Sequence, residues 1–266
     1  MIRLYDAHNH LQDGRFAGQA DRLLAEAQAA GVSAMVVNGS GVGDWPAVAA
    51  IARAHPDIVI PCFGVHPWYA HEQPADWMDQ LRYWLGEFPA AGVGEIGLDR
   101  WKPDLAWEGQ REVFESQLRL AAERNRPASI HCLQAWGPLT ESLEQTPHPA
   151  RGFLLHSYGG STELLDRLLP MGAHISFPGY FAHERKTRQQ ATFRRAPLDR
   201  LLIETDAPDQ PLPDSLATHQ LADPAGDPIN HPANLAAIYE FVARLRGIEL
   251  ADLSAQVERN FRRLFV

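Results

Sequence analysis

Eight short apolar segments alternate with helix-like segments along the chain, and this alternation restricts the fold more than any other feature of the sequence. Each apolar segment has the length of a β-strand, and the intervening stretches have the spacing of amphipathic helices. Such alternation predicts a parallel sheet, and eight units favour a closed (β/α)8 barrel over an open doubly wound sheet. The predicted strands span residues 4–10, 34–38, 58–63, 91–96, 128–131, 152–156, 173–177 and 201–204. The predicted helices span residues 19–30, 45–54, 75–87, 107–124, 138–145, 162–169, 184–195, 232–245 and 250–265.

The units follow one another without a linker. The Pro-rich stretch 207–232 could be taken for a domain boundary, but it follows the last predicted strand and suits a long active-site loop better. We therefore expect one domain over residues 1–266, with its active site at the carboxyl ends of the strands.

The composition argues against several classes of protein. A hydrophobic content of 45% supports a sizeable core, but no apolar run approaches the roughly 20 residues that cross a bilayer. The first residues do not resemble a secretion signal, so a cytoplasmic location is expected. Cys62 and Cys132 lie in apolar segments and form no C-x-x-C pair, which favours free thiols. The net charge of −9 argues against binding of nucleic acid through a broad basic surface. Bound cations could still supply the local positive charge that a phosphate substrate requires.

The first predicted strand carries the pattern H-x-H. Alternate side chains of a strand share a face, so Asp6, His8 and His10 are expected to point the same way. Two neutral imidazoles that converge can hold a divalent cation. The alternative is a pair of histidines that is exposed or hydrogen-bonded in the core, because H-x-H alone is a common pattern.

Further polar residues fall at the ends of later strands. They are Glu95, His131, His156 and Asp206. Each has an ordinary explanation by itself, such as a structural histidine or a helix N-cap. Together with His8 and His10 they supply the mixed nitrogen and oxygen donors that Zn²⁺, Mn²⁺ or Mg²⁺ ions prefer.

These segments resemble the TatD-like metal-dependent hydrolases, a deoxyribonuclease-type branch of the amidohydrolase superfamily. The resemblance runs from end to end of the chain. The matching segments include Asp6-Ala7-His8-Asn9-His10, Gly64-Val65-His66-Pro67, Gly94-Glu95-Ile96-Gly97-Leu98-Asp99, Ser129-Ile130-His131-Cys132, Leu155-His156-Ser157, Ile175-Ser176-Phe177 and Glu204-Thr205-Asp206-Ala207-Pro208.

The resemblance implies two divalent ions, Mg²⁺, Mn²⁺ or Zn²⁺. His8 and His10 would hold one ion, His131 and His156 the other, with Glu95 bridging both and Asp206 completing the site. Two such ions would activate a water molecule, and Asp206 would take its proton. Glu204 would act as a second base or orient a ligand, unless it is a surface carboxylate.

Substrate contacts are predicted around this set, from His66, Trp68, Arg100, Trp101 and Tyr158. The aromatic rings would stack a base or sugar, and His66 belongs to a motif beside the family's active site. The alternative for the aromatic residues is packing at the top of the barrel.

The sequence departs from the family pattern at two positions. Leu133 stands where many relatives have Arg, and His231 stands where they tend to have Glu. Both departures leave the proposed ligands intact and affect substrate identity. The leading prediction is a 3'-5' exonuclease that acts on nucleic acid ends or on small phosphodiesters. We expect no association with a membrane and no obligate protein partner. The alternatives are an ester or amide hydrolase, such as an aminoacyl-tRNA deacylase, and a catalytically silent binding scaffold.

Overall fold

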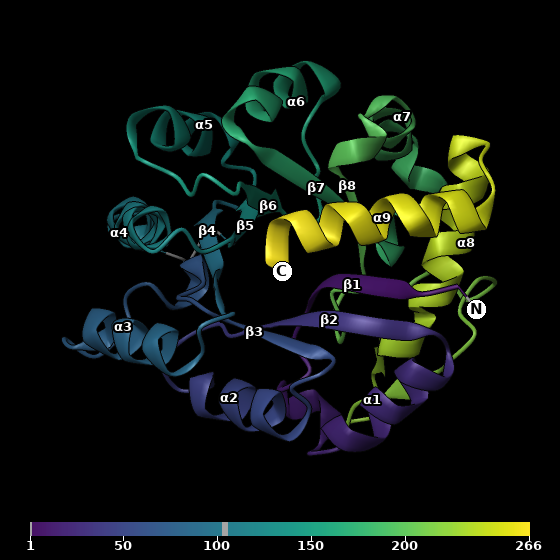
Figure 1. Cartoon of the computed structure of the whole chain (residues 1–266), viewed down its shortest axis with the longest axis horizontal. Helices are drawn as coiled ribbons and strands as arrows, with labels where there is room; N and C mark the ends of the chain where they lie inside the picture. Colours follow the sequence, from purple (N-terminus) through teal and green to yellow (C-terminus); the bar gives the residue numbers. More distant parts are fainter. Residues whose placement is uncertain (1, 103–105) are drawn as a thin grey trace.

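The eight predicted strands form one parallel sheet in chain order, as the computed structural model shows for residues 2–102 and 106–266 (Figure 1). The sheet closes where β1 meets the segment after β8, because Asp206 N–H donates to the carbonyl of His8 (2.9 Å) and His10 N–H donates to that of Ala207 (2.8 Å). The prediction of a (β/α)8 barrel is therefore confirmed. The strands are β1 (Leu4–Asn9), β2 (Val32–Asn38), β3 (Val59–Phe63), β4 (Gly92–Asp99), β5 (Ala128–Leu133), β6 (Phe153–Leu155), β7 (Ala173–Pro178) and β8 (Leu201–Glu204).

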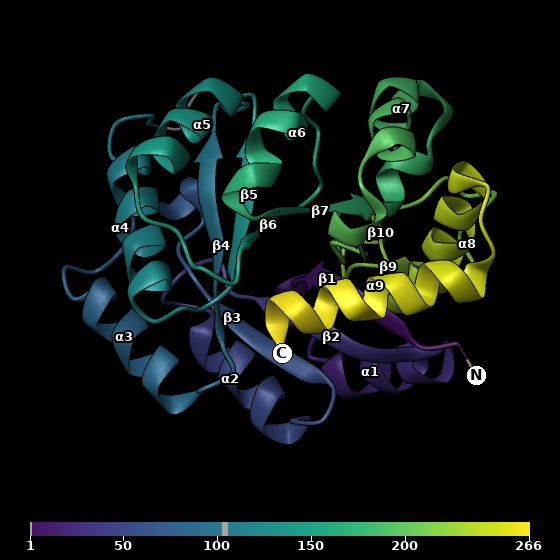
Figure 2. The ribbon, with the colours of Figure 1, turned by 45° about the horizontal axis from the view of Figure 1, so that its top comes forward.

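Helices cover the outside of this ring, as Figure 2 shows from a second direction. They are α1 (Ala20–Ala29), α2 (Trp45–Ala54), α3 (Trp77–Glu87), α4 (Gln110–Glu123), α5 (Trp136–Gln145), α6 (Thr162–Leu168), α7 (Thr187–Arg195) and α8 (Leu235–Arg246), whereas α9 (Leu250–Phe265) crosses one end of the ring (Figure 1). Among the described residues, no helix is both long enough and apolar enough to span a bilayer. Cys62 and Cys132 are buried free thiols, as predicted.

Several ends differ from prediction, and one difference affects the site. The sequence predicts a strand that stops at residue 96, whereas β4 continues to Asp99 and pairs with β5 through Leu98 and Asp99. Glycine at position 97 weakens the strand signal, but pairing with β5 carries the strand past it. This extension brings the Asp99 carboxylate to the carboxyl end of the barrel.

The amino-terminal end of the barrel is bound to α9. The Ser254 hydroxyl donates to the carbonyl of Arg3 (2.5 Å), and the Asn260 amide donates to that of Leu201 (2.7 Å). Arg3 precedes β1 and Leu201 begins β8, so both bonds lie at strand starts. Hydrogen bonds to α9 therefore hold this end of the barrel, whereas loops form the opposite end.

The stretch after β8 is the long loop that the sequence predicts. It contains a short hairpin of β9 (Leu221–Ala222) and β10 (Pro228–Ile229). Asn230 ties the loop back to the strand end, because its amide donates to the carbonyl of Thr205 (2.8 Å). The loop therefore begins and ends beside the carboxyl end of β8.

Candidate metal centre

His8 and His10 point at one another from the same side of β1. Their Nε2 atoms lie 3.2 Å apart. Each Nδ1 atom has a partner on another strand, since His8 Nδ1 lies 2.8 Å from Ser129 Oγ and His10 Nδ1 donates to the carbonyl of Asn38 (2.8 Å). The second bond places the hydrogen of a neutral His10 on Nδ1 and leaves the Nε2 lone pair free for a cation. The predicted convergence of this pair is confirmed.

Asp6 does not join the two imidazoles, although strict alternation predicts it on the same face. Its carboxylate accepts hydrogen bonds from the backbone N–H (2.9 Å) and the hydroxyl (2.6 Å) of Thr205. The register with β2 shifts between Asp6 and Asn9, so regular alternation is interrupted there. Asp6 therefore fastens β1 to the end of β8.

Glu95 of β4 lies between two pairs of histidines. Its Oε2 atom is 3.1 Å from His10 Nε2 and 3.5 Å from His8 Nε2. Its Oε1 atom is 2.8 Å from His156 Nε2 and 3.1 Å from His131 Nδ1. Metal–ligand bonds of about 2.0–2.2 Å place neighbouring donor atoms roughly 2.8–3.6 Å apart. Each carboxylate oxygen therefore sits among donors at the spacing that one cation requires.

Asp206 lies at the same centre, directly after β8. Its Oδ1 atom is 3.6 Å from His8 Nε2 and 3.7 Å from His10 Nε2, while its Oδ2 atom accepts a hydrogen bond from the amide of Gln210 (2.7 Å). The residue has a left-handed backbone, with φ of 53°. Non-glycine residues seldom adopt this conformation outside tight turns and functional sites. This turn therefore places the Asp206 carboxylate.

Glu204 is completely buried behind His156, which rules out the alternative of a surface carboxylate. Its Oε1 atom accepts hydrogen bonds from the backbone N–H (2.7 Å) and hydroxyl (2.6 Å) of Ser157, and its Oε2 atom accepts one from Ser176. The same Oε1 lies 3.7 Å from His156 Nδ1. Because the serines occupy its oxygens, the carboxylate is better placed to orient His156 than to take a proton from water.

Asp99 connects one ligand to the loop that follows β4. Its Oδ2 atom accepts hydrogen bonds from His131 Nε2 (2.9 Å) and from the indole N–H of Trp68 (2.8 Å). Its Oδ1 atom accepts one from the backbone N–H of Trp101 (2.6 Å). A carboxylate behind a histidine fixes the ring orientation and raises its basicity toward a metal. Asp99 therefore supports His131 and two predicted substrate contacts at once.

Burial and mutual charge set the protonation of the centre. Burial lowers the pKa of His8 to about 3, so this ring is neutral and can donate a lone pair. Burial also disfavours charge on His10, but the hydrogen bond and charge of Glu95 outweigh it and raise the His10 pKa to about 9. Burial tends to raise the Glu95 pKa, but the neighbouring histidines, His66 and His156 first, hold it well below its usual value. Burial raises the pKa of Asp206 to about 7.

His66 also faces Glu95, with its Nε2 atom 3.4 Å from Oε1. Together with Glu95 and His131 it forms one of the donor groups compact enough to hold an ion. Its Nδ1 atom, however, accepts a hydrogen bond from the backbone N–H of Trp68 (3.1 Å). Burial lowers its pKa to about 4, so the neutral ring carries its hydrogen on Nε2. His66 therefore presents an N–H donor to the centre, which fits a substrate contact better than a metal ligand.

Solvent reaches the centre from the carboxyl end of the barrel. The side chains of His10, His131 and Asp206 are 11%, 14% and 9% exposed. Beyond them the aromatic and basic side chains form a rim, where Lys102 Nζ lies 3.3 Å from the ring centroid of Trp68. Trp101 is 54% exposed and free to meet a substrate.

Arg100 and Tyr158 differ in what they offer a substrate. Arg100 is exposed and lies over the ring of Trp107, with 3.8 Å between the guanidinium carbon and the ring centroid. Tyr158 is fully buried, its hydroxyl donates to the carbonyl of Ser161 (2.8 Å), and its ring packs edge-on against Trp136. The prediction of Tyr158 as a substrate contact is therefore corrected in favour of the packing alternative.

The two departures from the family pattern have different consequences. Leu133 is 38% exposed at the end of β5, two residues after His131, so an apolar side chain faces solvent there. His231 is buried and pairs with Glu26 of α1, with 2.7 Å between Nε2 and Oε2. The backbone N–H of Ala233 donates to its Nδ1 (3.0 Å). His231 therefore anchors the final loop to α1, whereas Leu133 changes the surface beside the centre.

Sequence reasoning missed a set of supporting residues. They lie inside or next to the quoted motifs, which is the signal that could have found them. They are Asp99, Ser129, Ser157, Ser176 and Gln210.

Comparisons with known proteins cover the whole of this architecture. The family model described as TatD related DNase matches residues 5–266. A Pantoea ananatis protein named 3'-5' ssDNA/RNA exonuclease TatD is 30% identical over 263 residues, covering 98% of this chain and 99% of that protein. An Erwinia tasmaniensis protein of the same name is 32% identical over 264 residues, with coverage of 98% and 99%.

A solved structure agrees with these matches. The crystal structure of YJJV, a TatD homolog from Escherichia coli, matches with a TM-score of 0.88 at 27% identity, covering 99% of this chain and 98% of that chain. The matched region contains all eight barrel strands and the six donors that converge at their carboxyl ends. The chain therefore belongs to the family of TatD-related DNases.

Proposed function

We propose that this protein is a metal-dependent 3'-5' exonuclease that hydrolyses phosphodiester bonds at single-stranded DNA or RNA ends. The observation that carries the proposal is the position of Glu95, whose two oxygens face two separate pairs of histidines at 2.8–3.5 Å. Relatives that match nearly the full chain are named as exonucleases of this kind. The free buried thiols fit a reducing compartment, and we propose that the enzyme works in the cytoplasm.

Two divalent ions, Mg²⁺, Mn²⁺ or Zn²⁺, would be held on either side of Glu95. His8, His10 and Asp206 would hold one with Oε2, and His131 and His156 would hold the other with Oε1. When bound, such ions lower the pKa of a coordinated water and neutralise charge on a phosphoryl group. The donor set suits them, because it mixes neutral imidazoles with carboxylates.

Asp206 would serve as the general base. Its Oδ1 atom faces the centre, while Gln210 holds its Oδ2 atom at 2.7 Å and so fixes the orientation of the carboxylate. Proton transfer to such a positioned group contributes about 10²- to 10⁴-fold in rate. Glu204 would act through His156, whose Nδ1 atom lies 3.7 Å from its Oε1, while the Ser157 N–H holds that oxygen in place.

The substrate would be held by donors and rings at the rim. The Nε2–H of His66 would donate to a phosphate oxygen, and Trp68 and Trp101 would stack with the terminal bases. Stacking is worth about 1–3 kcal/mol per base and is tolerant of sequence. Arg100 would add a positive charge beside the strand, while the overall charge of −9 favours short ends over long duplex.

A second candidate is hydrolysis of a carboxylic ester or amide at the same centre. The exposed Leu133 favours it, because an apolar group there suits a less charged substrate than an arginine would.

The test is digestion of a 5'-labelled single-stranded oligonucleotide by the protein loaded with Mg²⁺, Mn²⁺ or Zn²⁺. We expect a ladder of fragments shortened from the 3' end, and the same protein with the ions chelated should leave the oligonucleotide intact. Ester and amide substrates assayed at the same metal loading provide the comparison. Folded, metal-loaded protein that cleaves esters but leaves every oligonucleotide intact would contradict the exonuclease and support the second candidate.

A further inference from the structure

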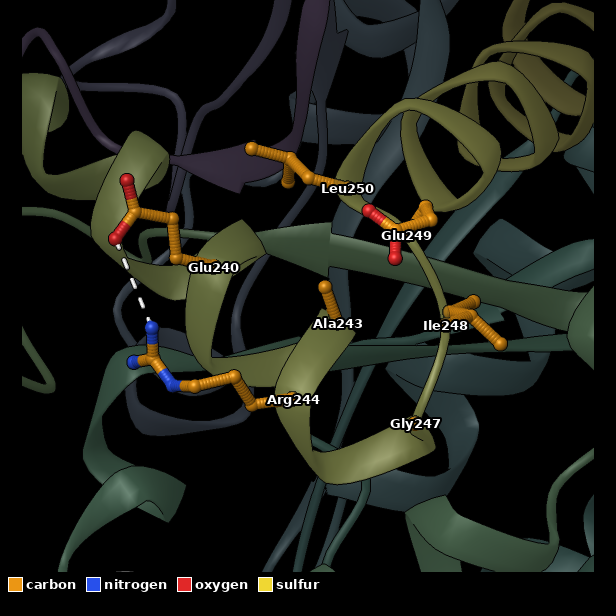
Figure 3. Close-up of a pocket in the computed structure, with 7 residues that line it drawn as sticks. All are labelled: Glu240, Ala243, Arg244, Gly247, Ile248, Glu249 and Leu250. Atoms are coloured by element: carbon orange, nitrogen blue, oxygen red, sulfur yellow. Dashed lines mark ion pairs between the residues drawn. The ribbon is translucent and has the colours of Figure 1, made fainter.

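Two hollows lie away from the metal centre. One, of about 340 Å³, is at the turn between α8 and α9, where Glu240 and Arg244 form an ion pair of 3.8 Å (Figure 3). Its lining holds two carboxylates, Glu240 and Glu249, and one arginine, so it has no excess of positive charge. The other, of about 680 Å³, has a different character, because four arginines line it, namely Arg3, Arg126, Arg151 and Arg262.

The larger hollow lies at the amino-terminal end of the barrel, opposite the metal centre. Arg3 precedes β1, Arg126 precedes β5 and Arg151 precedes β6, so these residues all lie at strand starts. The last residues of α9 form another wall, through Arg262 and Phe265. Figure 1 shows this end of α9 near the middle of the strand ring. We call this space the basal hollow.

Two of the four arginines already have a carboxylate partner. Arg3 and Arg262 both pair with Glu258, at 2.6 Å and 2.9 Å. Within the described chain, no acidic side chain forms an ion pair with Arg126 or Arg151, although Asp57 also lines the hollow. The basal hollow therefore carries two arginine charges that the protein leaves uncompensated.

Arg126 is the less easily explained of the two. Its Nε–H is buried and has no hydrogen-bond partner among the described residues. Burial lowers the pKa of its guanidinium, and the neighbouring charges of Arg151 and Arg124 lower it further. A buried donor without a partner lowers the stability of the folded protein. Residues at this end of a barrel usually contribute to stability, so such a donor is unexpected here. Arg126 therefore offers the hollow a donor that no described residue uses.

We propose that the basal hollow is a binding site for a phosphate group, carried by a small anion and held by Arg126 and Arg151. Planar guanidinium groups match the geometry of phosphate oxygens and form strong charge-assisted hydrogen bonds with them. The volume lies within the range of small-molecule sites, and Ile58, Ile60 and Phe265 supply apolar wall for the rest of the ligand. This site is independent of the metal centre and of the reaction proposed for it.

Calorimetric titration of the metal-loaded full chain with inorganic phosphate tests the site. Three proteins are compared: wild type, the double variant Arg126→Gln with Arg151→Gln, and the control Arg124→Gln, whose side chain is exposed and does not line the hollow. We expect at least about a tenfold loss of basal phosphate affinity in the double variant, because charge-assisted contacts are removed. The control should bind like wild type. Phosphate held at the metal centre is common to all three proteins.

Unchanged affinity and stoichiometry in the double variant would overturn the proposal. A second titration, with a nucleoside 5'-monophosphate, separates the possible sources of the phosphate group. If the nucleoside monophosphate binds more tightly than inorganic phosphate, the natural ligand is a nucleotide. If the two bind equally, the site recognises the phosphate group alone. Equal competition by chloride at the same ionic strength would show that the charge attracts any anion, which contradicts a built site.

Thermal unfolding of Arg126→Met gives an independent readout. Without phosphate, the variant should melt at or above the wild-type temperature, because a buried donor without a partner has been removed. Phosphate should then raise the melting temperature of wild type more than that of the variant. The proposal would be wrong if the variant melted at a lower temperature than wild type and phosphate did not stabilise wild type. Arg126 would then have a structural role.

Discussion

At the carboxyl ends of the strands, buried charges of both signs lie within 4 Å of one another, and hydrogen bonds from neighbouring strands hold them in place. At the amino-terminal ends, four arginines and one aspartate line one hollow, and within the described chain only Arg3 and Arg262 among these arginines have a carboxylate partner, Glu258. The same eight strands support both arrangements. The strands therefore supply only a frame, and a second set of polar contacts distinguishes the end that holds the candidate reaction centre.

The largest effect should follow from Glu95→Ala. This change removes the carboxylate shared by both halves of the centre, so hydrolysis should fall at least about 10³-fold, because the several kcal/mol that bound ions contribute is lost. The measurement is oligonucleotide cleavage together with metal content, and far-ultraviolet circular dichroism confirms the fold. Glu95→Gln, which keeps the shape, should lose metal as well. Normal activity at normal metal content in either variant would contradict the bridging role.

Asp206→Asn should separate metal binding from proton transfer. The amide keeps an oxygen for the ion but cannot take a proton, so we expect turnover to fall about 10²- to 10³-fold with metal still bound. Single-turnover kinetics at saturating metal checks this. Wild-type turnover in this variant would exclude Asp206 as the base.

Asp99→Asn should weaken metal binding about 10- to 100-fold, because a carboxylate behind a ligating histidine is lost. It should also raise the KM for oligonucleotides, since one amide oxygen cannot accept from His131, Trp68 and Trp101 as the two carboxylate oxygens do. The matched control is Asp57→Asn, which changes an aspartate at the opposite end of the barrel. Equal metal affinity in the two variants would contradict the claim that Asp99 supports the metal centre and Asp57, at the opposite end, does not.

Metal affinity should fall as the pH decreases. In the metal-free protein the pKa of His10 is raised to about 9, so this ring is protonated at neutral pH and must lose its proton to bind an ion. For one such proton, affinity should drop about tenfold per pH unit below 9. Calorimetry in buffers with different ionisation enthalpies measures the released proton. Binding without proton release at pH 7 would show that the ion avoids His10.

The smallest effect should come from Glu258→Gln at the amino-terminal end. Its ion pairs with Arg3 and Arg262 are partly exposed, and such pairs contribute about 0–1 kcal/mol. Denaturant unfolding should show a loss of that size, with unchanged hydrolysis. A large loss of activity would mean that the two ends are coupled.

The sequence predicts most of the fold and the six central donors, for a clear physical reason. Alternating strand and helix patterns are local features of the sequence, and each donor lies in a short motif at a strand end. Both the strands and the donors can therefore be recognised without the three-dimensional structure. The carboxyl end of a barrel then brings such strand-end residues together.

The supporting contacts do not follow from the sequence in the same way. Whether Ser129 reaches His8, or Ser176 reaches Glu204, depends on the register between strands. Alternation also fails where it meets irregular backbone, as at Asp6. Tyr158 shows the remaining difficulty, because a residue two positions after a ligand can lie beneath the site instead of facing it.

The most direct measurement of the central claim is anomalous X-ray diffraction from crystals of the protein grown with Mn²⁺. The account predicts two anomalous peaks, one between Glu95 and the pair His8 and His10, the other between Glu95 and the pair His131 and His156. Manganese bound elsewhere, or no ion beside either oxygen of Glu95 in protein that still cleaves oligonucleotides, would contradict it.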